Sequence, residues 1–168
     1  MTALLLAWLA LAPALAAPAD IAGSWALDAD ASDDIDDILA ARGATWMERQ
    51  AIKHVPVTHV ITHTEDAVVI AIESPIYSRS DTLKTDNRAR TRESKRLGTL
   101  TLRNYWDNEV LVTVTDMVLP DGVPATLTVT RTLVDPDTMH MRLELVATDG
   151  RQMEGTRVLR RTEDASAR

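Results

Sequence analysis

Short strand-like runs follow one another from Val57 to the end of the chain, separated about every ten positions by turn residues such as Asp-Asn and Asp-Gly. Nine runs are predicted, at 57–64, 67–74, 78–85, 89–96, 98–106, 109–118, 124–134, 138–147 and 151–160, and a further strand is predicted at 21–27. A sheet of many short antiparallel strands removes its exposed edges by closing on itself. We therefore expect an all-β fold, a ten-stranded antiparallel up-and-down β-barrel.

The segment between the first two predicted strands changes to a helical period. Ser32 is a suitable N-cap before an acidic first turn and an apolar stripe, which predicts a helix over 32–41. Thr45 and Glu48 have the spacing of a capping box, which predicts a second helix over 45–53. The sequence thus predicts a helix-turn-helix lid between strands 1 and 2.

The chain begins with an apolar run that ends in small residues. The run is shorter than the roughly 20 residues that span a bilayer, and its end suits cleavage after Ala16. We interpret 1–16 as a signal peptide and 17–168 as a single barrel domain, so the protein is expected to be periplasmic or secreted. The alternative is an apolar helix that is not cleaved.

Composition excludes several classes of function. The 168-residue chain has no Cys, which excludes disulfides, thiol catalysis and thiolate metal sites. Its net charge of -7 comes from 18 basic and 25 acidic residues, which argues against a nucleic-acid-binding face. His59 and His63 are about 13 Å apart along a strand, too far for one metal ion. No hydrolase, metalloprotease or phosphate-loop motif occurs, so no cofactor, metal site or catalytic residue is predicted.

Two arginines interrupt strict apolar alternation. In the run 126–133, Thr occupies every even position, and Arg131 stands in the apolar register. Arg157 has the same parity as the apolar positions of the last strand. Counting through the turns at Pro136 and Asp149 places Met141 opposite both arginines. Because neighbouring strands are about 4.8 Å apart, the two Cα atoms are expected roughly 10 Å apart in one inward-facing row.

Two guanidinium groups at that spacing can converge on one anion, and a carboxylate suits their paired donors. The wall around them would be aliphatic, formed by Leu127, Val129, Leu133, Met141, Leu143 and Leu145. The alternative is that the arginines are neutralised internally, with Asp116 as the leading partner and Glu73 as another. Both interpretations can hold together, because one carboxylate cannot use every donor of two guanidinium groups. The aliphatic wall is equally consistent with an ordinary packed core.

The basic run 88–96, RARTRESKR, is typical of a solvated strand and turn, and contact with anionic lipid is the alternative interpretation.

The chain resembles the fatty-acid-binding-protein branch of the lipocalin-like (calycin) barrels, in a bacterial exported form. Gly23-Ser24-Trp25 is similar to the Gly-x-Trp of that family's first strand, and residues 35–50 look like its helical lid. Arg131 matches the family's arginine in its eighth strand. Thr156-Arg157-Val158-Leu159 resembles the final-strand Arg-x-Tyr motif that binds a fatty-acid carboxylate. Leu159 stands where the tyrosine would be, so one carboxylate contact of the family is lost.

The leading hypothesis is an exported, non-enzymatic binding protein that holds a fatty acid or similar hydrophobic carboxylate inside the barrel. Its expected ligand-binding residues are Arg131, Arg157, Met141, Leu159, Val129 and Leu143. A monomer with a small hydrophobic or amphipathic ligand and no nucleic-acid partner is expected, and transient membrane contact is left open. The alternatives are a structural or interaction barrel with a filled core, and an enzyme that acts on an apolar acid.

Overall fold

The computed structural model describes residues 18–162, which form ten strands and two short helices. Each predicted strand is present, with both ends within two residues of their expected positions. The leader predicted at 1–16 lies outside the described residues. In chain order the elements are β1 (Gly23–Asp28), α1 (Asp36–Ala41), α2 (Trp46–His54), β2 (Thr58–His63), β3 (Ala67–Ser74), β4 (Tyr77–Lys84), β5 (Arg90–Ser94), β6 (Gly98–Asp107), β7 (Val110–Val118), β8 (Pro124–Asp135), β9 (Thr138–Ala147) and β10 (Gln152–Thr162).

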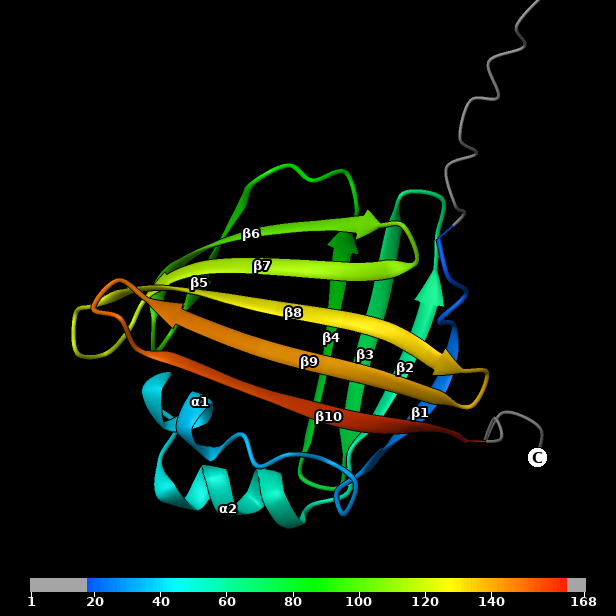
Figure 1. Cartoon of the computed structure of the whole chain (residues 1–168), viewed down its shortest axis with the longest axis horizontal. Coiled ribbons are helices and arrows are strands. Elements are labelled where there is room, and N and C mark those ends of the chain that lie inside the picture. Colours follow the sequence, from blue (N-terminus) through cyan, green and yellow to red (C-terminus); the bar gives the residue numbers. More distant parts are fainter. Residues whose placement is uncertain (1–17, 163–168) are drawn as a thin grey trace, which may run out of the picture.

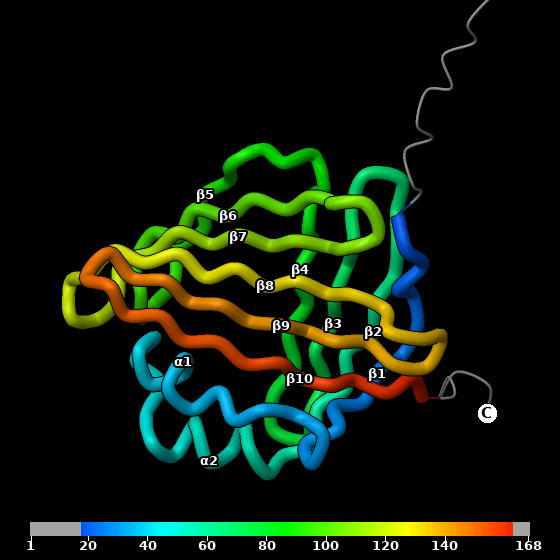
Figure 2. The backbone as a smooth tube through the Cα atoms, viewed as in Figure 1, coloured from blue at the N-terminus to red at the C-terminus, as the bar shows by residue number. Residues whose placement is uncertain are grey.

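All ten strands belong to one curled antiparallel sheet in the order β4-β3-β2-β1-β10-β9-β8-β7-β6-β5. The first and last strands pair in its middle, where Trp25 is opposite Arg161. Figures 1 and 2 show β6–β10 crossing in front of β2–β4, with the two helices below β10 at one end. The predicted ten-stranded all-β fold with a helical lid after the first strand is therefore confirmed.

Closure of the barrel differs from the prediction at β4 and β5, which are the two ends of the sheet and do not pair. Side chains bridge this opening instead, because Arg92 Nη1 of β5 lies 2.8 Å from Asp81 Oδ1 of β4. β5 is only five residues long and is rich in charge, as is common for strands that leave an edge unpaired.

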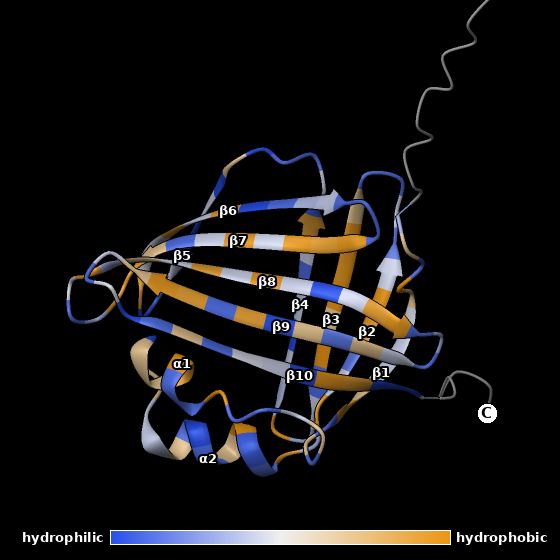
Figure 3. Cartoon of the chain, in the orientation of Figure 1, coloured by the Kyte–Doolittle hydropathy of each residue, from blue (hydrophilic) through white to orange (hydrophobic). Residues whose placement is uncertain are grey.

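Apolar side chains fill the two ends of the barrel as separate clusters. The lid-end cluster contains Ile35 and Ile38 from the lid side, packed with residues of β6–β9 such as Leu127 and Leu145. The base cluster contains Trp25, Ile61, Leu111, Met139 and Leu159, among others. Met141 packs partly buried against both clusters. Figure 3 shows apolar and polar residues alternating along β8 and β9, which gives each strand one face toward these clusters.

The residues before β1 cover the base. Ile21 is fully buried in the base cluster, and its carbonyl accepts a hydrogen bond of 3.0 Å from Trp25 Nε1. The Arg161 guanidinium lies 4.2 Å from the centroid of the Trp25 ring, in the range of a cation–π contact. The base is therefore closed by side chains from both ends of the described chain.

The first helix is shorter than predicted, and Ser32 is not its N-cap. α1 begins at Asp36, and Ser32 Oγ instead accepts a hydrogen bond of 2.9 Å from the Val158 amide. The Asp33 amide donates a hydrogen bond to the Thr156 carbonyl, and the Asp33 carboxylate accepts one from the Thr156 amide. The segment at 32–33 thus hydrogen-bonds to β10 beyond the end of β1, and the helix begins only at Asp36.

The second helix follows its prediction. Thr45 and Glu48 form the complete capping box at the start of α2. Ion pairs then tie α2 to the segment around α1, since Lys53 binds Asp34 and Arg49 binds Asp36, each at 3.0 Å. These exposed or half-buried pairs position the lid more than they stabilise it.

Gly155 is the point where the lid segment rests on β10. A Cβ atom at this position would lie 2.8 Å from Ile35 Cγ2. Ile35 is buried, and its β-branched side chain cannot rotate away freely. We predict that Gly155→Ala lowers the free energy of unfolding by about 1–3 kcal/mol through overpacking. Urea unfolding of a double-mutant cycle tests the cause: the cost should largely disappear in an Ile35→Ala background, and an equal cost in both backgrounds would contradict it.

Candidate functional site

Arg131 and Arg157 lie in one inward-facing row, as the sequence predicts. Met141 pairs with Arg131 on one side and with Arg157 on the other. Leu111 continues this row on β7, opposite Arg131. Both arginines are buried, with 8% and 7% of their surface exposed. The row crosses the middle of the barrel, between the lid-end cluster and the base cluster.

No carboxylate neutralises either arginine at contact distance. Among residues 18–162 neither guanidinium takes part in an ion pair or side-chain hydrogen bond, and the Nε atom of each is buried without a partner. Asp81 and Asp34 are the carboxylates whose charges favour the protonated forms of Arg131 and Arg157 respectively, and both act through space. Within residues 18–162 the site thus holds buried positive charge that only carboxylates beyond contact distance offset.

Burial disfavours the charged form of both guanidinium groups. Loss of solvation lowers the pKa of Arg131 to about 10, and burial also lowers the pKa of Arg157. Both guanidinium groups nevertheless stay protonated at neutral pH. Placing such charges in an apolar interior costs free energy unless an anion or other acceptor pairs with them.

The predicted internal partners of the arginines are wrong. Asp116 lies on the outer face, where it accepts a 2.8 Å hydrogen bond from Thr126 Oγ1 and faces Arg103 at 3.7 Å. It has the opposite parity to Leu111, the β7 residue opposite Arg131. Glu73 is exposed and pairs in the sheet with Thr58, also on the outer face. Pairing of the arginines with these two carboxylates is therefore excluded.

His59 is part of the interior. It pairs with Trp25 and with Ile72, and only 6% of it is exposed. Burial and the charges of Arg131 and Arg157 together lower the pKa of His59 to about 4. Its Nδ1 is buried without a partner among the described residues. Its alternation with the buried Ile61 was the available sequence signal for this position.

Two neutral polar side chains, Asn104 and Thr113, lie in the row next to that of Arg131. Asn104 pairs with Thr113, and Thr113 pairs with Val129 in the row next to Arg131. Asn104 Oδ1 and Thr113 Oγ1 are buried, and neither has a hydrogen-bond partner in the part of the chain that the structure describes. Three kinds of unsatisfied polar group therefore face the same interior: guanidinium, imidazole, and neutral amide or hydroxyl.

The aliphatic wall is on the predicted face. Leu127, Leu143 and Leu145 are buried in the lid-end cluster, and Leu159 is fully buried in the base cluster. Val129 and Met141 also face inward but keep partial exposure. The remaining predicted wall residue, Leu133, packs partly buried against the base cluster.

A pocket of about 300 Å³ at the lid includes one residue of the arginine row, Arg157. Arg157 is on its wall, together with Ile35 and Leu39 of the α1 segment and Ile52 and Lys53 of α2. Its volume is at the lower end of the range for small-molecule sites. The rest of its wall comes from the 29–35 segment and α2 and includes Asp33 and Asp34, so the lid-side pocket is lined by Arg157 but not by Arg131 or Met141.

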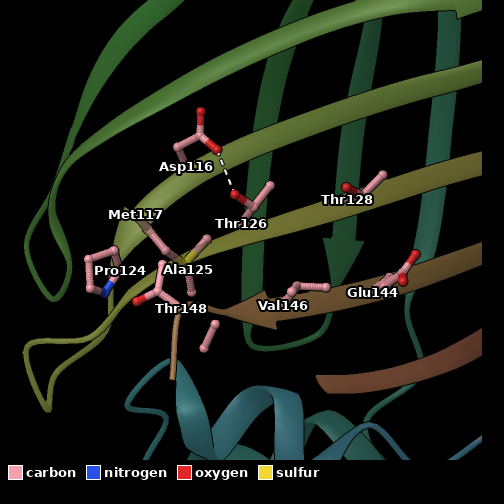
Figure 4. Close-up of a pocket in the computed structure, with 10 residues that line it drawn as sticks. Asp116, Met117, Pro124, Ala125, Thr126, Thr128, Glu144, Val146 and Thr148 are labelled. Carbon is pink, nitrogen blue, oxygen red and sulfur yellow. Dashed lines mark hydrogen bonds between the residues drawn. The ribbon is translucent and has the colours of Figure 1, made fainter. Parts of the chain in front are cut away.

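A larger hollow of about 510 Å³ does not belong to this site. Figure 4 shows Thr126, Thr128, Glu144 and Val146 lining it, beside the Asp116–Thr126 hydrogen bond. These side chains alternate with the inward-facing leucines of β8 and β9, so the hollow lies on the outer face of the sheet.

Other classes of site receive no support from the geometry. Within residues 18–162, no three His, Asp or Glu side chains are arranged to hold a metal ion. His63, the second histidine considered from sequence, is exposed, and its ring centroid is 5.8 Å from that of Trp106. Neither helix of the described chain is long and apolar enough to cross a bilayer.

Comparisons with known proteins identify the fold. No family model and no curated protein sequence matches the chain. Solved structures do match: a protein described as the REP1-NXSQ fatty acid transporter aligns with a TM-score of 0.67 and 18% identity, over 86% of this chain and 98% of its own. Lipid binding protein 8 of Caenorhabditis elegans aligns with a TM-score of 0.68 and 13% identity, over 89% of this chain and 100% of its own.

A fatty acid binding protein of Schistosoma mansoni, solved in complex with arachidonic acid, aligns with a TM-score of 0.63 and 22% identity. That alignment covers 84% of this chain and 96% of the other. The chain therefore has the fold of the fatty-acid-binding proteins, as the resemblance of its sequence motifs predicted. These structural neighbours are described as lipid-binding proteins or transporters rather than enzymes.

The low pKa of His59 predicts a specific pH dependence of stability. Above pH 6.5 the imidazole is neutral in both folded and unfolded chains, whereas between pH 6.5 and about 4 only the unfolded chain takes up the proton. The free energy of unfolding therefore decreases as the pH falls below 6.5, by about 2 kcal/mol at pH 5. We expect urea unfolding between pH 7.5 and pH 5 to show a drop larger by about that amount in the wild type than in His59→Leu. Equal drops would contradict neutral burial of His59, and His54→Gln, at an exposed position, is the matched control.

Proposed function

We propose that this protein is an exported carrier that holds a fatty acid or a similar hydrophobic carboxylate inside the barrel, with Arg131 and Arg157 binding the head group. One observation carries this proposal: two buried guanidinium groups share a row and have no carboxylate partner at contact distance among the described residues. Met141, Val129, Leu143 and Leu159 would contact the part of the ligand next to the head group.

The physical argument rests on the desolvation cost of the arginines. An ionised carboxylate placed between them would receive charge-assisted hydrogen bonds from both forks, each stronger than a neutral hydrogen bond. It would also supply the negative charge that burial of the two groups requires. The ligand therefore completes an arrangement that the chain alone leaves unfavourable.

The apolar clusters favour a long aliphatic tail over a compact acid. Ile21 and Trp25 block the base, so a tail attached to a head group at the arginine row would extend toward the lid end. Its neighbours there would be Val129 and Leu143, and Leu39 at the lid-side pocket. The wall has no Phe and accordingly offers flexible aliphatic contacts rather than aromatic stacking.

The structural neighbours support this proposal by analogy of fold, because one of them was solved with arachidonic acid and another is described as a fatty acid transporter. Fold similarity by itself does not fix a ligand. The interior arginines of this chain supply the independent chemical reason for a carboxylate.

Export and membrane contact complete the proposal. The apolar leader at 1–16 supports secretion or a periplasmic location for a monomeric carrier. The basic run at 88–96 ends beside the lid, where Arg96 binds Glu48 of α2 at 2.6 Å. Such a surface would favour transient contact with an anionic membrane during ligand transfer.

Neutralising the arginine row should abolish tight binding without loss of fold. We predict that Arg131→Gln and Arg157→Gln each weaken binding of hexadecanoate by about 10- to 100-fold, since a hydrogen bond to a charged group contributes about 1.5–3 kcal/mol. Isothermal titration calorimetry measures this effect. Arg142→Gln is the matched control, because Arg142 pairs with Glu154 on the outer face.

The same variants should keep or increase the thermal stability of the ligand-free protein, because each removes an uncompensated buried charge. Unchanged hexadecanoate affinity in both variants, with the fold intact, would contradict the head-group role.

A further inference from the structure

Asn104 of β6 is a neutral polar residue buried on the inner face of the barrel. Leu102 and Trp106 share its face and pack against the lid-end and base clusters respectively, which places Asn104 between the two clusters. Only 5% of Asn104 is exposed, and within residues 18–162 its Oδ1 atom accepts no hydrogen bond. The backbone is held by pairing with β7 and by the Asn87 amide, which donates a hydrogen bond of 2.9 Å to the Asn104 carbonyl. The side chain is therefore fixed toward the interior.

Thr113 of β7 is the cross-strand neighbour of Asn104 and carries a second polar atom of this kind. It shares its face with Leu111 of the base cluster and Met117 of the lid-end cluster, so it also faces the interior. Thr113 Oγ1 is buried, and no group in the described part of the chain hydrogen-bonds to it, Asn104 included. Two buried polar atoms without partners are costly, and such groups in a native protein call for a physical reason.

This pair lies one step toward the lid from the arginine row. Its row continues through Val129 and Leu143, which pack in the lid-end cluster, to Gly155. Consecutive inward positions of a strand are about 7 Å apart, which corresponds to about five carbon–carbon bonds of a hydrocarbon chain. A tail that runs from a head group at the arginine row toward the lid would therefore pass Asn104 and Thr113 within the first half of a sixteen-carbon chain.

The interior beside the pair has room for such a chain, and its chemistry is neutral. Thr113 and Val129 face inward yet stay partly exposed, as does Met141 of the arginine row, so protein atoms do not fill the space next to them. None of the five residues in the row of Asn104 carries a charge. An amide oxygen accepts hydrogen bonds, and a hydroxyl both donates and accepts them. The complementary ligand group is therefore an alcohol rather than a second ion.

We propose that Asn104 and Thr113 select a fatty acid that carries a hydroxyl group on the part of its chain near the carboxylate. This inference rests on the proposed function, because Arg131 and Arg157 hold the head group and thereby set the position of the chain. The ligand hydroxyl donates a hydrogen bond to Asn104 Oδ1 and accepts one from Thr113 Oγ1. A site built to hydrogen-bond a hydroxyl discriminates against the analogue that lacks it, because the buried groups of the site then stay unpaired. An ordered water molecule that bridges the two atoms is the competing explanation.

Isothermal titration calorimetry with hexadecanoate and its 3-hydroxy, 6-hydroxy and 16-hydroxy derivatives tests this selection. We expect the wild type to bind the 3-hydroxy or the 6-hydroxy acid at least about tenfold more tightly than hexadecanoate. The 16-hydroxy acid carries its hydroxyl at the far end of the chain, away from the pair, and should bind no more tightly than hexadecanoate.

Variants of similar shape assign the preference to the two side chains. Asn104→Leu and Thr113→Val should each lower the hydroxyl preference by about threefold or more, and the double variant should bind the hydroxy acid and hexadecanoate equally within about twofold. Thr128→Val, on the outer face of β8, is the matched control and should keep the wild-type preference. Without ligand, both interior variants should be at least as thermally stable as the wild type, because each removes a buried polar atom that has no partner among the described residues.

The outcomes distinguish this inference from the proposed function. Hexadecanoate binding that depends on Arg131 and Arg157, without a preference for either hydroxy acid, would overturn the selection, favour a bridging water and leave the carrier function standing. A preference that survives in the double variant would overturn the role of the pair equally. Failure of the wild type to bind any of the acids would overturn the carrier function, and this inference with it.

Discussion

The burial of positive charge between two apolar clusters is the constraint on which the rest of this barrel depends. Arg131 and Arg157 prevent the lid-end and base clusters from merging into one continuous core, since their guanidinium groups lie in the row between them. The neighbouring polar groups adapt to that charge: burial and the two arginines lower the pKa of His59, and no acidic side chain among residues 18–162 contacts the row. These two cations without a carboxylate at contact distance are the reason for proposing a carboxylate ligand.

Much of this arrangement could be predicted from sequence because β8 to β10 are joined by tight turns and strictly patterned. The Thr and Leu alternation around Arg131 fixed its face, and turn counting placed Met141 opposite both arginines. Alternation failed for Asp116, because β7 has apolar residues at both parities. Asp116 continues the parity of Val110, Val112 and Val114, whereas the β7 residue opposite the inward Arg131 is Leu111, of the other parity.

The lid was predictable only where local chemistry decides the structure. The capping box of Thr45 and Glu48 is complete within four residues, and α2 begins there. Ser32 has equally good local capping chemistry, but its hydroxyl is used by the Val158 amide, a partner 126 positions away. The interior position of His59 could be expected from its alternation with Ile61, but its charged neighbours could not, because Arg131 and Arg157 lie on strands remote in sequence.

The two apolar clusters have a kinetic consequence. Ile21 and Trp25 fill the base, and Ile35 and Ile38 pack into the cluster at the lid end. A molecule bound at the arginine row would therefore have to displace packed side chains to enter or leave the barrel. Its residence time would depend on how often the lid segment moves away from β10, and not on the strength of the head-group contacts alone.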